Sequence, residues 1–243
     1  MVARAVTWAA MMHGGEGHRR SRRRQRDAAR TIDGVNGEVD QLALFGDAAP
    51  SHVPGLPPGW EYRADFIDVD EEATLLAFIA TLPLAAARYK GYTARRRVVH
   101  FGAAYDYDDN RLLPAPPVPA ELEPLRAKAA AWIGEAPDAL ANALVAEYRA
   151  GVPLGWHRDV PDYETVVGVS LAGPARMRFR RYPPVAPKKA DVVSLELAAR
   201  SAYVLRAEAR WGWQHSVAPT PALRYSITFR TRSALGRRRG IGN

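Results

Sequence analysis

The chain has 243 residues, of which 47% are hydrophobic, and this is enough for one well-cored domain of ordinary size. It contains no cysteine, which excludes disulfides, thiolate metal sites and a cysteine nucleophile, so any metal must be held by histidine and carboxylate groups. The formal charge of +8 favours an acidic partner, with nucleic acid as the first candidate. The sequence has no apolar run of about 18 residues, so it predicts no membrane-spanning segment.

Residues 1–52 lack periodicity and contain a dense basic run, Arg19-Arg20-Ser21-Arg22-Arg23-Arg24-Gln25-Arg26. Like charges at this density repel one another and stay solvated, so we expect a basic, disordered tail. The tail is either a non-specific arm for phosphate groups or a dispensable extension. Only Arg4 precedes the short apolar stretch near the start, which does not fit a secretion signal, so we expect a cytoplasmic protein.

A proline-rich linker ends near Trp60 and leads into a domain that we expect to span residues 53–232. Its first part, 60–141, combines strand and helix patterns. The elements predicted there are a strand at 62–67, a helix at 70–81 capped by Asp70, a strand at 95–101 and a helix at 120–134.

Arginines and tyrosines occur together in this first part. Arg95, Arg96 and Arg97 begin the second strand, and a polar loop with Tyr105 and Tyr107 follows it. A nucleic-acid contact would use such residues, because the charges bind phosphate and the rings stack on bases. The alternative is an ordinary exposed edge strand with a turn.

From Asn142 onwards the pattern changes to short strands separated by turn signals. This pattern predicts a mainly β fold with flanking helices, and a double-sheet jelly roll has the right number of strands. We place the jelly roll at 142–232 and a basic C-terminal tail at 233–243. The predicted strands cover 142–149, 153–158, 165–171, 175–181, 190–197, 201–206, 213–217 and 223–231.

The last strand carries charge on one face. At the period of a strand, Tyr225, Ile227 and Phe229 point one way, and Arg224, Ser226, Thr228 and Arg230 point the other way. Arginines on an inner face need anionic partners, because a buried unpaired guanidinium is very costly, and the guanidinium plane matches a carboxylate. The strand therefore predicts one wall of a pocket for a small acid.

A possible metal site lies among the strands. His157 and Asp159 are two residues apart, so on a strand both side chains fall on one face, and His215 follows in a later strand. Two neutral imidazoles and one carboxylate form the facial triad of non-haem Fe(II) oxygenases, which leaves coordination positions open. Such a centre needs a co-substrate that supplies two electrons, and a keto acid bound by an arginine fits the last strand.

The ordered set of motifs resembles the AlkB-like Fe(II)/2-oxoglutarate dioxygenases over about Trp60 to Arg232. The motif R-Y-x-[IL]-T-F-R at 224–230 is specific to that family. The residues that carry the resemblance are Glu147-Tyr148, Trp156-His157-Arg158-Asp159, Val167-Gly168-Val169-Ser170-Leu171, Gln214-His215-Ser216 and Arg224-Tyr225-Ser226-Ile227-Thr228-Phe229-Arg230.

The resemblance implies a double-stranded β-helix with an N-terminal α/β region that acts as a lid over the substrate. It implies Fe(II) as the metal, with 2-oxoglutarate and O2 as co-substrates. The implied iron ligands are His157, Asp159 and His215, and the implied 2-oxoglutarate contacts are Tyr148, Arg224, Ser226 and Arg230. A straight strand would separate the two arginine stems by about 20 Å, so both reach a five-carbon acid only if the strand coils strongly.

The sequence departs from the family at three positions. Glu147 and Ser226 stand where asparagine is common, and we expect the Glu147 carboxylate to turn away, because it would repel an anionic co-substrate. Pro161 stands where DNA-repair members carry an acid that contacts the damaged base. This third departure puts the identity of the base, and the base itself as substrate, in doubt.

Three functions remain open. The first is oxidative demethylation of alkylated nucleobases in DNA or RNA by a monomer, as in DNA repair. The second is the same chemistry on a protein or small molecule, and the third is a non-enzymatic basic domain that binds nucleic acid. The remaining residues of note receive ordinary structural interpretations: His100 as an exposed strand residue, Arg178, Arg180 and Arg181 as a solvated strand face, and Trp156, Trp211 and Trp213 as core.

Overall fold

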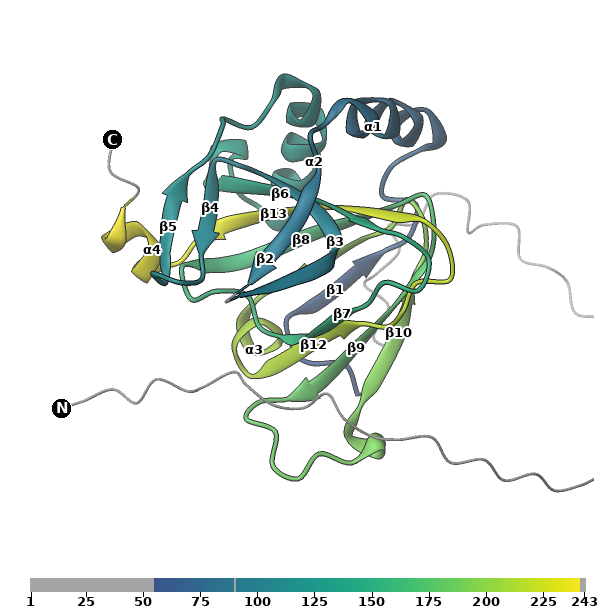
Figure 1. Cartoon of the computed structure of the whole chain (residues 1–243), viewed down its shortest axis with the longest axis vertical. Helices are drawn as coiled ribbons and strands as arrows, with labels where there is room; N and C mark the ends of the chain where they lie inside the picture. The colour runs from purple at the N-terminus through teal and green to yellow at the C-terminus, as the bar shows by residue number, and fades with distance from the viewer. Residues whose placement is uncertain (1–54, 90, 241–243) are drawn as a thin grey trace, which may run out of the picture. The chain divides into compact units, whose positions relative to one another are not determined.

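The computed structural model describes residues 55–89 and 91–240, so the tail expected at 1–52 lies outside the described residues. Two antiparallel sheets make up most of the described chain (Figure 1). The larger sheet has the strand order β1-β11-β8-β13-β6-β3-β2, and the smaller has the order β10-β9-β12-β7. A separate hairpin consists of β4 and β5. The fold is the double-stranded β-helix that the sequence predicts.

The strands are β1 (Trp60–Arg63), β2 (Ala85–Tyr89), β3 (Tyr92–Phe101), β4 (Ala103–Asp106), β5 (Arg111–Pro114), β6 (Leu140–Tyr148), β7 (Leu154–His157), β8 (Tyr163–Leu171), β9 (Ala175–Arg181), β10 (Val193–Leu197), β11 (Ala202–Leu205), β12 (Trp213–Val217) and β13 (Arg224–Arg232). The α-helices are α1 (Val69–Thr81), α2 (Glu123–Ile133), α3 (Ala207–Trp211) and α4 (Ala234–Arg239). Short 3-10 turns lie at Ala120–Leu122, Pro137–Ala139 and Lys189–Asp191. None of the described helices is long and apolar enough to cross a membrane.

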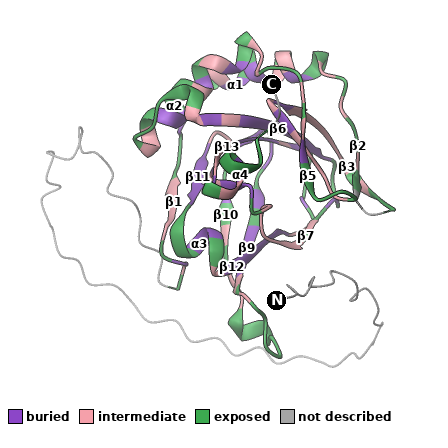
Figure 2. Cartoon of the chain, turned by 90° about the vertical axis from the view of Figure 1, so that its left-hand side faces the viewer, coloured by how far each residue is buried: buried purple, intermediate pink, exposed green. Residues whose placement is uncertain are grey.

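The larger sheet has one apolar face, which helices α1 and α2 cover. The alternation predicted for the last strand is confirmed, because Ile227 and Phe229 of β13 pack in this core beside Val145 of β6. Leu75 of α1 and Leu125 of α2 reach the same cluster. Buried residues follow the strands of both sheets, whereas the outer sides of the two helices are largely exposed (Figure 2). The opposite face of β13 is thereby directed between the sheets.

The eight strands predicted after residue 142 all exist, with ends that differ by three residues or fewer. Earlier in the chain, the strand expected at 62–67 is β1 at Trp60–Arg63, and β2 at Ala85–Tyr89 was not predicted. Three further details differ. The N-cap of α1 is Asp68 rather than Asp70, because its carboxylate accepts the Glu71 amide at 2.8 Å and completes a capping box. The loop expected around Tyr105 is part of the β4–β5 hairpin, and residues 234–239 of the expected tail form α4.

Gly102 joins β3 to β4 and has a positive φ of 75°. A Cβ placed there would lie 2.2 Å from the Ala141 carbonyl oxygen, which belongs to the neighbouring strand and has little room to move. The joint thus needs glycine both for its backbone conformation and for close approach. It fixes where the β4–β5 hairpin leaves the larger sheet.

We predict that Gly102→Ala destabilises the protein by about 2 kcal/mol or more, because backbone strain and a backbone clash act together. Gly134→Ala is the matched control, since Gly134 also has a positive φ but has no atom within 4 Å of its built Cβ. That variant should lose only about 1 kcal/mol. Urea unfolding of both variants measures the difference, and equal losses would show that the clash with Ala141 is relieved.

Candidate active site

Strands β7 and β12 bring two histidines together. His157 and His215 are paired residues across these strands, and their ring centroids are 4.2 Å apart. Asp159 follows β7, and its Oδ2 lies 3.7 Å from Nε2 of His215. One ligand atom from each of the three residues lies within 4.8 Å of the others. The structure therefore brings together all three residues that the sequence singled out as metal ligands.

The donor set fits a divalent metal. Nδ1 of His157 lies 2.9 Å from the Gly155 carbonyl oxygen, which favours a proton on Nδ1 and leaves Nε2 free to bind a metal. Burial is the main cause that lowers the pKa of His157, and burial lowers that of His215 well below its ordinary value. Both imidazoles are thus neutral at neutral pH, which is the form that binds a metal.

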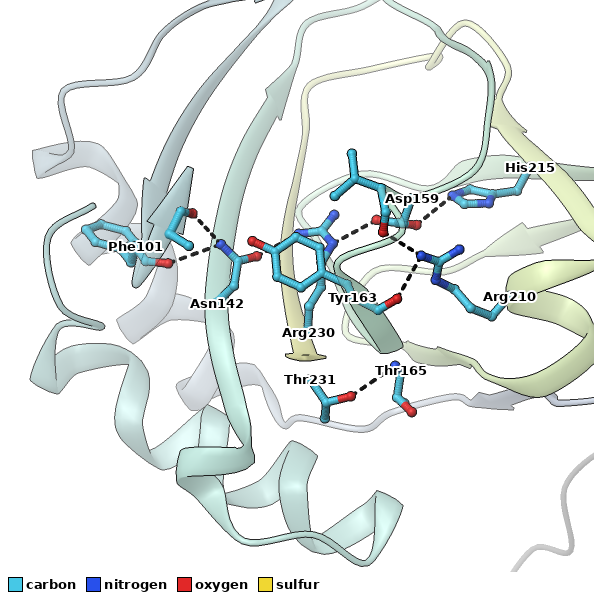
Figure 3. A network of polar contacts seen from close by, with 11 residues as sticks. Phe101, Asn142, Asp159, Tyr163, Thr165, Arg210, His215, Arg230 and Thr231 are labelled. Carbon is cyan, nitrogen blue, oxygen red and sulfur yellow. Dashed lines mark hydrogen bonds and ion pairs between the residues drawn. The ribbon is translucent and has the colours of Figure 1, made fainter. Parts of the chain in front are cut away.

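Arg230 holds the carboxylate of this cluster. Its Nε donates to Oδ1 of Asp159 at 2.7 Å, and Figure 3 shows Asp159 between Arg230 and His215. Burial opposes ionisation of Asp159 and is the largest single effect, but the nearby positive charges, Arg230 first and Arg210 also, together lower the pKa of this carboxyl. Asp159 is therefore ionised before any metal binds.

Arg210 fixes the segment that follows Asp159. This arginine lies on α3 and is 2% exposed, and its Nη2 donates to the carbonyl oxygens of Val160 at 2.7 Å and Tyr163 at 2.8 Å (Figure 3). The sequence did not predict this role. Nothing in the sequence clearly indicates a buried arginine here, because a single arginine in a short polar segment is usually solvated.

Asn142 also supports the cluster. It is a buried polar residue on β6, and its Oδ1 accepts from Nη1 of Arg230 at 3.0 Å. Its Nδ2 donates to the carbonyl oxygens of Phe101 at 3.2 Å and Ala103 at 2.6 Å, on either side of the Gly102 joint (Figure 3). One amide therefore ties Arg230 to the start of the β4–β5 hairpin.

Arg224 lies at the other end of β13 in a different environment. It is 2% exposed, its Nε donates to Oγ of Ser170 at 3.0 Å, and its guanidinium carbon lies 5.0 Å from the ring centre of Tyr148. Tyr148 is the paired residue of Arg224 on β6, and Ser226 is paired with Ser170 on β8. Among the described residues, no carboxylate forms an ion pair with Arg224.

The two arginines of β13 are therefore unequal. Both lie on the inner face, as the sequence predicted, but Arg230 already has Asp159 as an anionic partner, whereas Arg224 has neutral neighbours. A buried guanidinium without a carboxylate is costly unless an anion binds to it. The polar cluster of Tyr148, Ser170, Arg224 and Ser226 is thus suited to the carboxylate of a small ligand.

The arginines of β3 do not form one surface. Arg97 is paired with Glu147 on the outer face, and strand alternation places Arg96 on the inner face, where its guanidinium interacts with the Tyr148 hydroxyl. Arg95 is exposed, with the orientation of Arg97. Because neighbouring strand residues point to opposite faces, the three arginines do not share one face, and their contact with nucleic acid stays a prediction.

His100 lies on the same inner face as Arg96, which corrects its assignment as an exposed strand residue. Burial, followed by the positive charges of Arg230 and Arg96, lowers the pKa of His100 to about 4. The imidazole is therefore neutral at neutral pH. His100 is thus a further neutral imidazole whose titration is influenced by the charge of Arg230.

Glu147 turns away from the inner face, as its repulsion of an anionic co-substrate predicted. Its carboxylate accepts from Nε of Arg97 at 2.8 Å and from Nε of Arg149 at 3.2 Å. The adjacent residue Tyr148 points to the opposite face, toward Arg224. Glu147 therefore belongs to a charge cluster outside the larger sheet.

A pocket of about 400 Å³ lies between the β2–β3 turn and the β4–β5 hairpin. Tyr105 and Tyr107 line it, with their rings in an edge-to-face contact at 4.9 Å. Tyr92, Arg88, Asp106 and Asp108 also line it. Tyr107 of this pocket interacts electrostatically with Arg230, the arginine that holds Asp159.

Pro161 and Asp162 lie just after the metal-ligand carboxylate. Asp162 is fully buried and faces Arg239 of α4 at 3.4 Å, and its backbone carbonyl accepts the Ser233 amide. The Pro161 carbonyl accepts from the Ser233 hydroxyl. This segment is therefore occupied in anchoring the C-terminal helix.

Comparison with known proteins agrees with this geometry. Residues 74–230 match the model of the 2OG-Fe(II) oxygenase superfamily. An Arabidopsis thaliana protein described as an alkylated DNA repair protein ALKBH8 homolog is 31% identical over 66% of this chain and 51% of its own length. A Xenopus tropicalis tRNA (carboxymethyluridine(34)-5-O)-methyltransferase alkbh8 is 25% identical over 68% of this chain and 26% of its own length.

Solved structures show the same fold. The structure of OsALKBH1 superposes with a TM-score of 0.57, covers 72% of this chain and 98% of its own, and is 15% identical. A Pseudomonas putida prolyl-4-hydroxylase superposes with a TM-score of 0.50, covers 72% of this chain and 93% of its own, and is 16% identical. The fold and the cluster of two histidines and a carboxylate thus define an iron-dependent oxygenase.

This chain belongs to the 2OG-Fe(II) oxygenase superfamily, and it is similar in sequence to the ALKBH8 homolog and in fold to OsALKBH1. It is a dioxygenase that uses Fe(II), 2-oxoglutarate and O2. It spans about half the length of the Arabidopsis relative and about a quarter of the Xenopus relative, 51% and 26% respectively.

The Glu147 cluster gives a prediction about acid stability. The hydrogen bond from Arg97 is the main cause that lowers the pKa of Glu147 below its ordinary 4.5, with burial opposing it. A lowered folded-state pKa contributes stability that is present above pH 4.5 and is lost as the pH falls through the folded-state pKa. Glu147→Gln should therefore be less stable than the wild type at neutral pH and should lose less stability on acidification.

Urea unfolding between about pH 7 and about pH 3 measures this difference. The Michaelis constant for 2-oxoglutarate should stay within about twofold of the wild type in Glu147→Gln, since the carboxylate faces away from Arg224. An equal loss of unfolding free energy on acidification in the two proteins would contradict the role of the Arg97–Glu147 pair.

Proposed function

We propose that this protein oxidatively demethylates alkylated nucleobases in DNA or RNA, with His157, Asp159 and His215 as the iron ligands. The observation that carries the proposal is the environment of Arg224 on β13. A buried guanidinium without a carboxylate partner lies there on the same strand as the arginine that holds Asp159. When bound, Fe(II) with 2-oxoglutarate and O2 supplies the oxidation that puts a hydroxyl group on an N-methyl carbon, and the product then loses formaldehyde.

The residues of the chain have separate tasks in this proposal. Arg224 binds one carboxylate of 2-oxoglutarate, and Tyr148 and Ser226 donate hydrogen bonds beside it. Arg230 keeps Asp159 ionised and oriented, and its position on the inner face lets it approach the other carboxylate. Arg210 holds the backbone after Asp159, so the carboxylate cannot swing out of the cluster.

The tyrosine pocket supports a nucleobase as the substrate. Its volume of about 400 Å³ lies within the range usual for small-ligand sites. Tyr105 and Tyr107 offer rings on which a flipped base can stack, and Arg88 and Arg96 offer charges for the phosphates on either side of it. The names of the relatives also refer to alkylated DNA and to tRNA.

The second candidate is the same chemistry on a protein or small molecule. The observation in its favour is the segment of Pro161 and Asp162, which has no acid available for a base, since Asp162 is buried against Arg239. A nucleobase would then need its polar contacts from the tyrosine pocket, which is lined by the carboxylates of Asp106 and Asp108.

We predict formaldehyde release from methylated oligonucleotides, with equal amounts of succinate formed. The panel should hold single-stranded DNA and RNA with one N-methylated base each, and unmethylated strands of the same sequence as blanks. His157→Ala is the control and should release no formaldehyde, because it lacks a metal ligand. Turnover of 2-oxoglutarate without release from any methylated DNA or RNA would favour the second candidate.

Substitution of the two arginines of β13 should impair the enzyme in different ways. Arg224→Gln should raise the Michaelis constant for 2-oxoglutarate about tenfold or more, because it removes a buried charge-assisted contact, while iron binding is retained. Arg230→Gln should weaken iron binding and lower kcat, because Asp159 loses its buried partner.

Succinate formation at varied 2-oxoglutarate, together with anaerobic Fe(II) titration, separates these effects. Ser226→Ala serves as a milder comparison in the same cluster, since it removes one neutral hydrogen bond. If both arginine variants changed only the Michaelis constant, Arg230 would have no part in holding the metal ligand.

A further inference from the structure

The outer face of the smaller sheet carries a row of arginines. Along β9, Met177 and Phe179 point inward and pack in the core, so Arg176, Arg178 and Arg180 point outward. The sequence interpretation of Arg178 and Arg180 as a freely solvated face is incomplete, because both are only half-exposed. Their positions are fixed by neighbouring strands.

Each of these two guanidiniums is held by a neutral acceptor on β12. Nε of Arg178 donates to Oγ of Ser216 at 3.0 Å, and Nε of Arg180 donates to Oε1 of Gln214 at 2.8 Å. Both pairs are direct cross-strand partners. In the part of the chain that the structure describes, only Nε of each arginine has a hydrogen-bond partner, so the Nη groups are available to a ligand.

Trp156 completes this cluster from β7, which is the edge strand of the smaller sheet. The guanidinium carbons of Arg178 and Arg180 lie 5.2 Å and 4.4 Å from its ring centre. Trp156 is half-buried on the outer face, which corrects its assignment to the core. One indole therefore supports two positive charges side by side.

Within residues 55–89 and 91–240, no carboxylate forms an ion pair with Arg178 or Arg180 of this cluster. Burial is the largest effect that lowers the pKa of both guanidiniums, and for Arg180 the charge of Arg178 adds to it. Two desolvated like charges in contact with one ring favour a bound anion.

We propose that the Trp156–Arg178–Arg180 cluster is a phosphate-binding site for the backbone of the nucleic-acid substrate, on the outer face of the strands that carry the metal ligands. The proposal rests on the proposed function for the identity of that substrate. A backbone phosphodiester fits better than a carboxylate, because its two non-bridging oxygens are arranged tetrahedrally and each can accept from a different guanidinium, whereas a planar carboxylate matches one guanidinium.

The place of the cluster suits a chain that continues past the active site. Trp156 and His157 are neighbours, and so are His215 and Ser216, but alternation sends the histidines inward and the other two residues outward. Since β7 is an edge strand, a nucleic-acid backbone held by the cluster can pass around that edge. The contact adds affinity without reading the base.

The test measures binding of a fluorescein-labelled, unmodified single strand to the full chain by anisotropy, at several salt concentrations. The variant is Arg178→Gln/Arg180→Gln, and Arg237→Gln/Arg238→Gln on α4 is the control with the same loss of charge. In the first variant the slope of log affinity against log salt should fall by about 0.7, the value for the one phosphate group that the two guanidiniums share. In the control it should change by less than half of that.

Arg178→Lys/Arg180→Lys guards against a folding defect, since it keeps the charge and should restore most of the slope. Equal slopes for the variant and its control would overturn the proposal, because they would indicate a general charge effect. Competition by poly-glutamate as strong as by an unlabelled strand would also overturn it, in favour of an acidic protein partner.

The proposed demethylase function and the phosphate-binding site can be tested independently of each other. Oxidation of a methylated nucleoside, which is too short to reach the cluster, should be equal in wild type and Arg178→Gln/Arg180→Gln. If no methylated nucleic acid is oxidised but the salt slope still depends on the two arginines, the phosphate-binding site stands and the demethylase proposal falls.

Discussion

The ion pair between Arg230 and Asp159 is the contact on which the site depends. It joins β13 of the larger sheet to the segment after β7 of the smaller sheet, and its side chains are 12% and 6% exposed. Removing one partner of such a pair costs about 3–5 kcal/mol, because the other charge is left buried. Asn142 and Arg210 reduce the cost of burial by binding the guanidinium and the backbone after the carboxylate. The carboxylate is therefore ionised and oriented by the protein itself.

The same strand has a charge without a protein partner at its other end. Arg224 is as buried as any residue of the core, yet its neighbours are the hydroxyl of Ser170 and the ring of Tyr148. The contrast with Arg230 assigns different tasks to two arginines that look equivalent in the sequence. One stabilises a negative charge that the chain supplies, and the other is suited to a negative charge that a ligand supplies.

The sequence predicted well what depends on local pattern. The strands after residue 142, the two faces of β13 and the meeting of His157, Asp159 and His215 follow from periodicity and motif order. Arg210, Asn142 and His100 were missed, because each depends on a partner fifty or more residues away that no local pattern reveals: Val160 for Arg210, and Arg230 for Asn142 and His100. The arginines at Arg95–Arg97 were predicted together as candidates for a nucleic-acid contact, and alternation along β3 places Arg96 on the face opposite to Arg95 and Arg97.

Alternation also connects the metal site to the surface behind it. Because β7 and β12 direct His157 and His215 inward, they must direct Trp156, Gln214 and Ser216 outward, where these residues hold Arg178 and Arg180. A shift of register in either strand would disturb both faces at once, since a slip of one residue exchanges them. The strand pairing that assembles the metal ligands thus also fixes the arginine pair. The metal site and the arginine cluster share the backbone of β7 and β12. Substitutions of side chains on one face can therefore change one site without the other, whereas a change in strand pairing alters both.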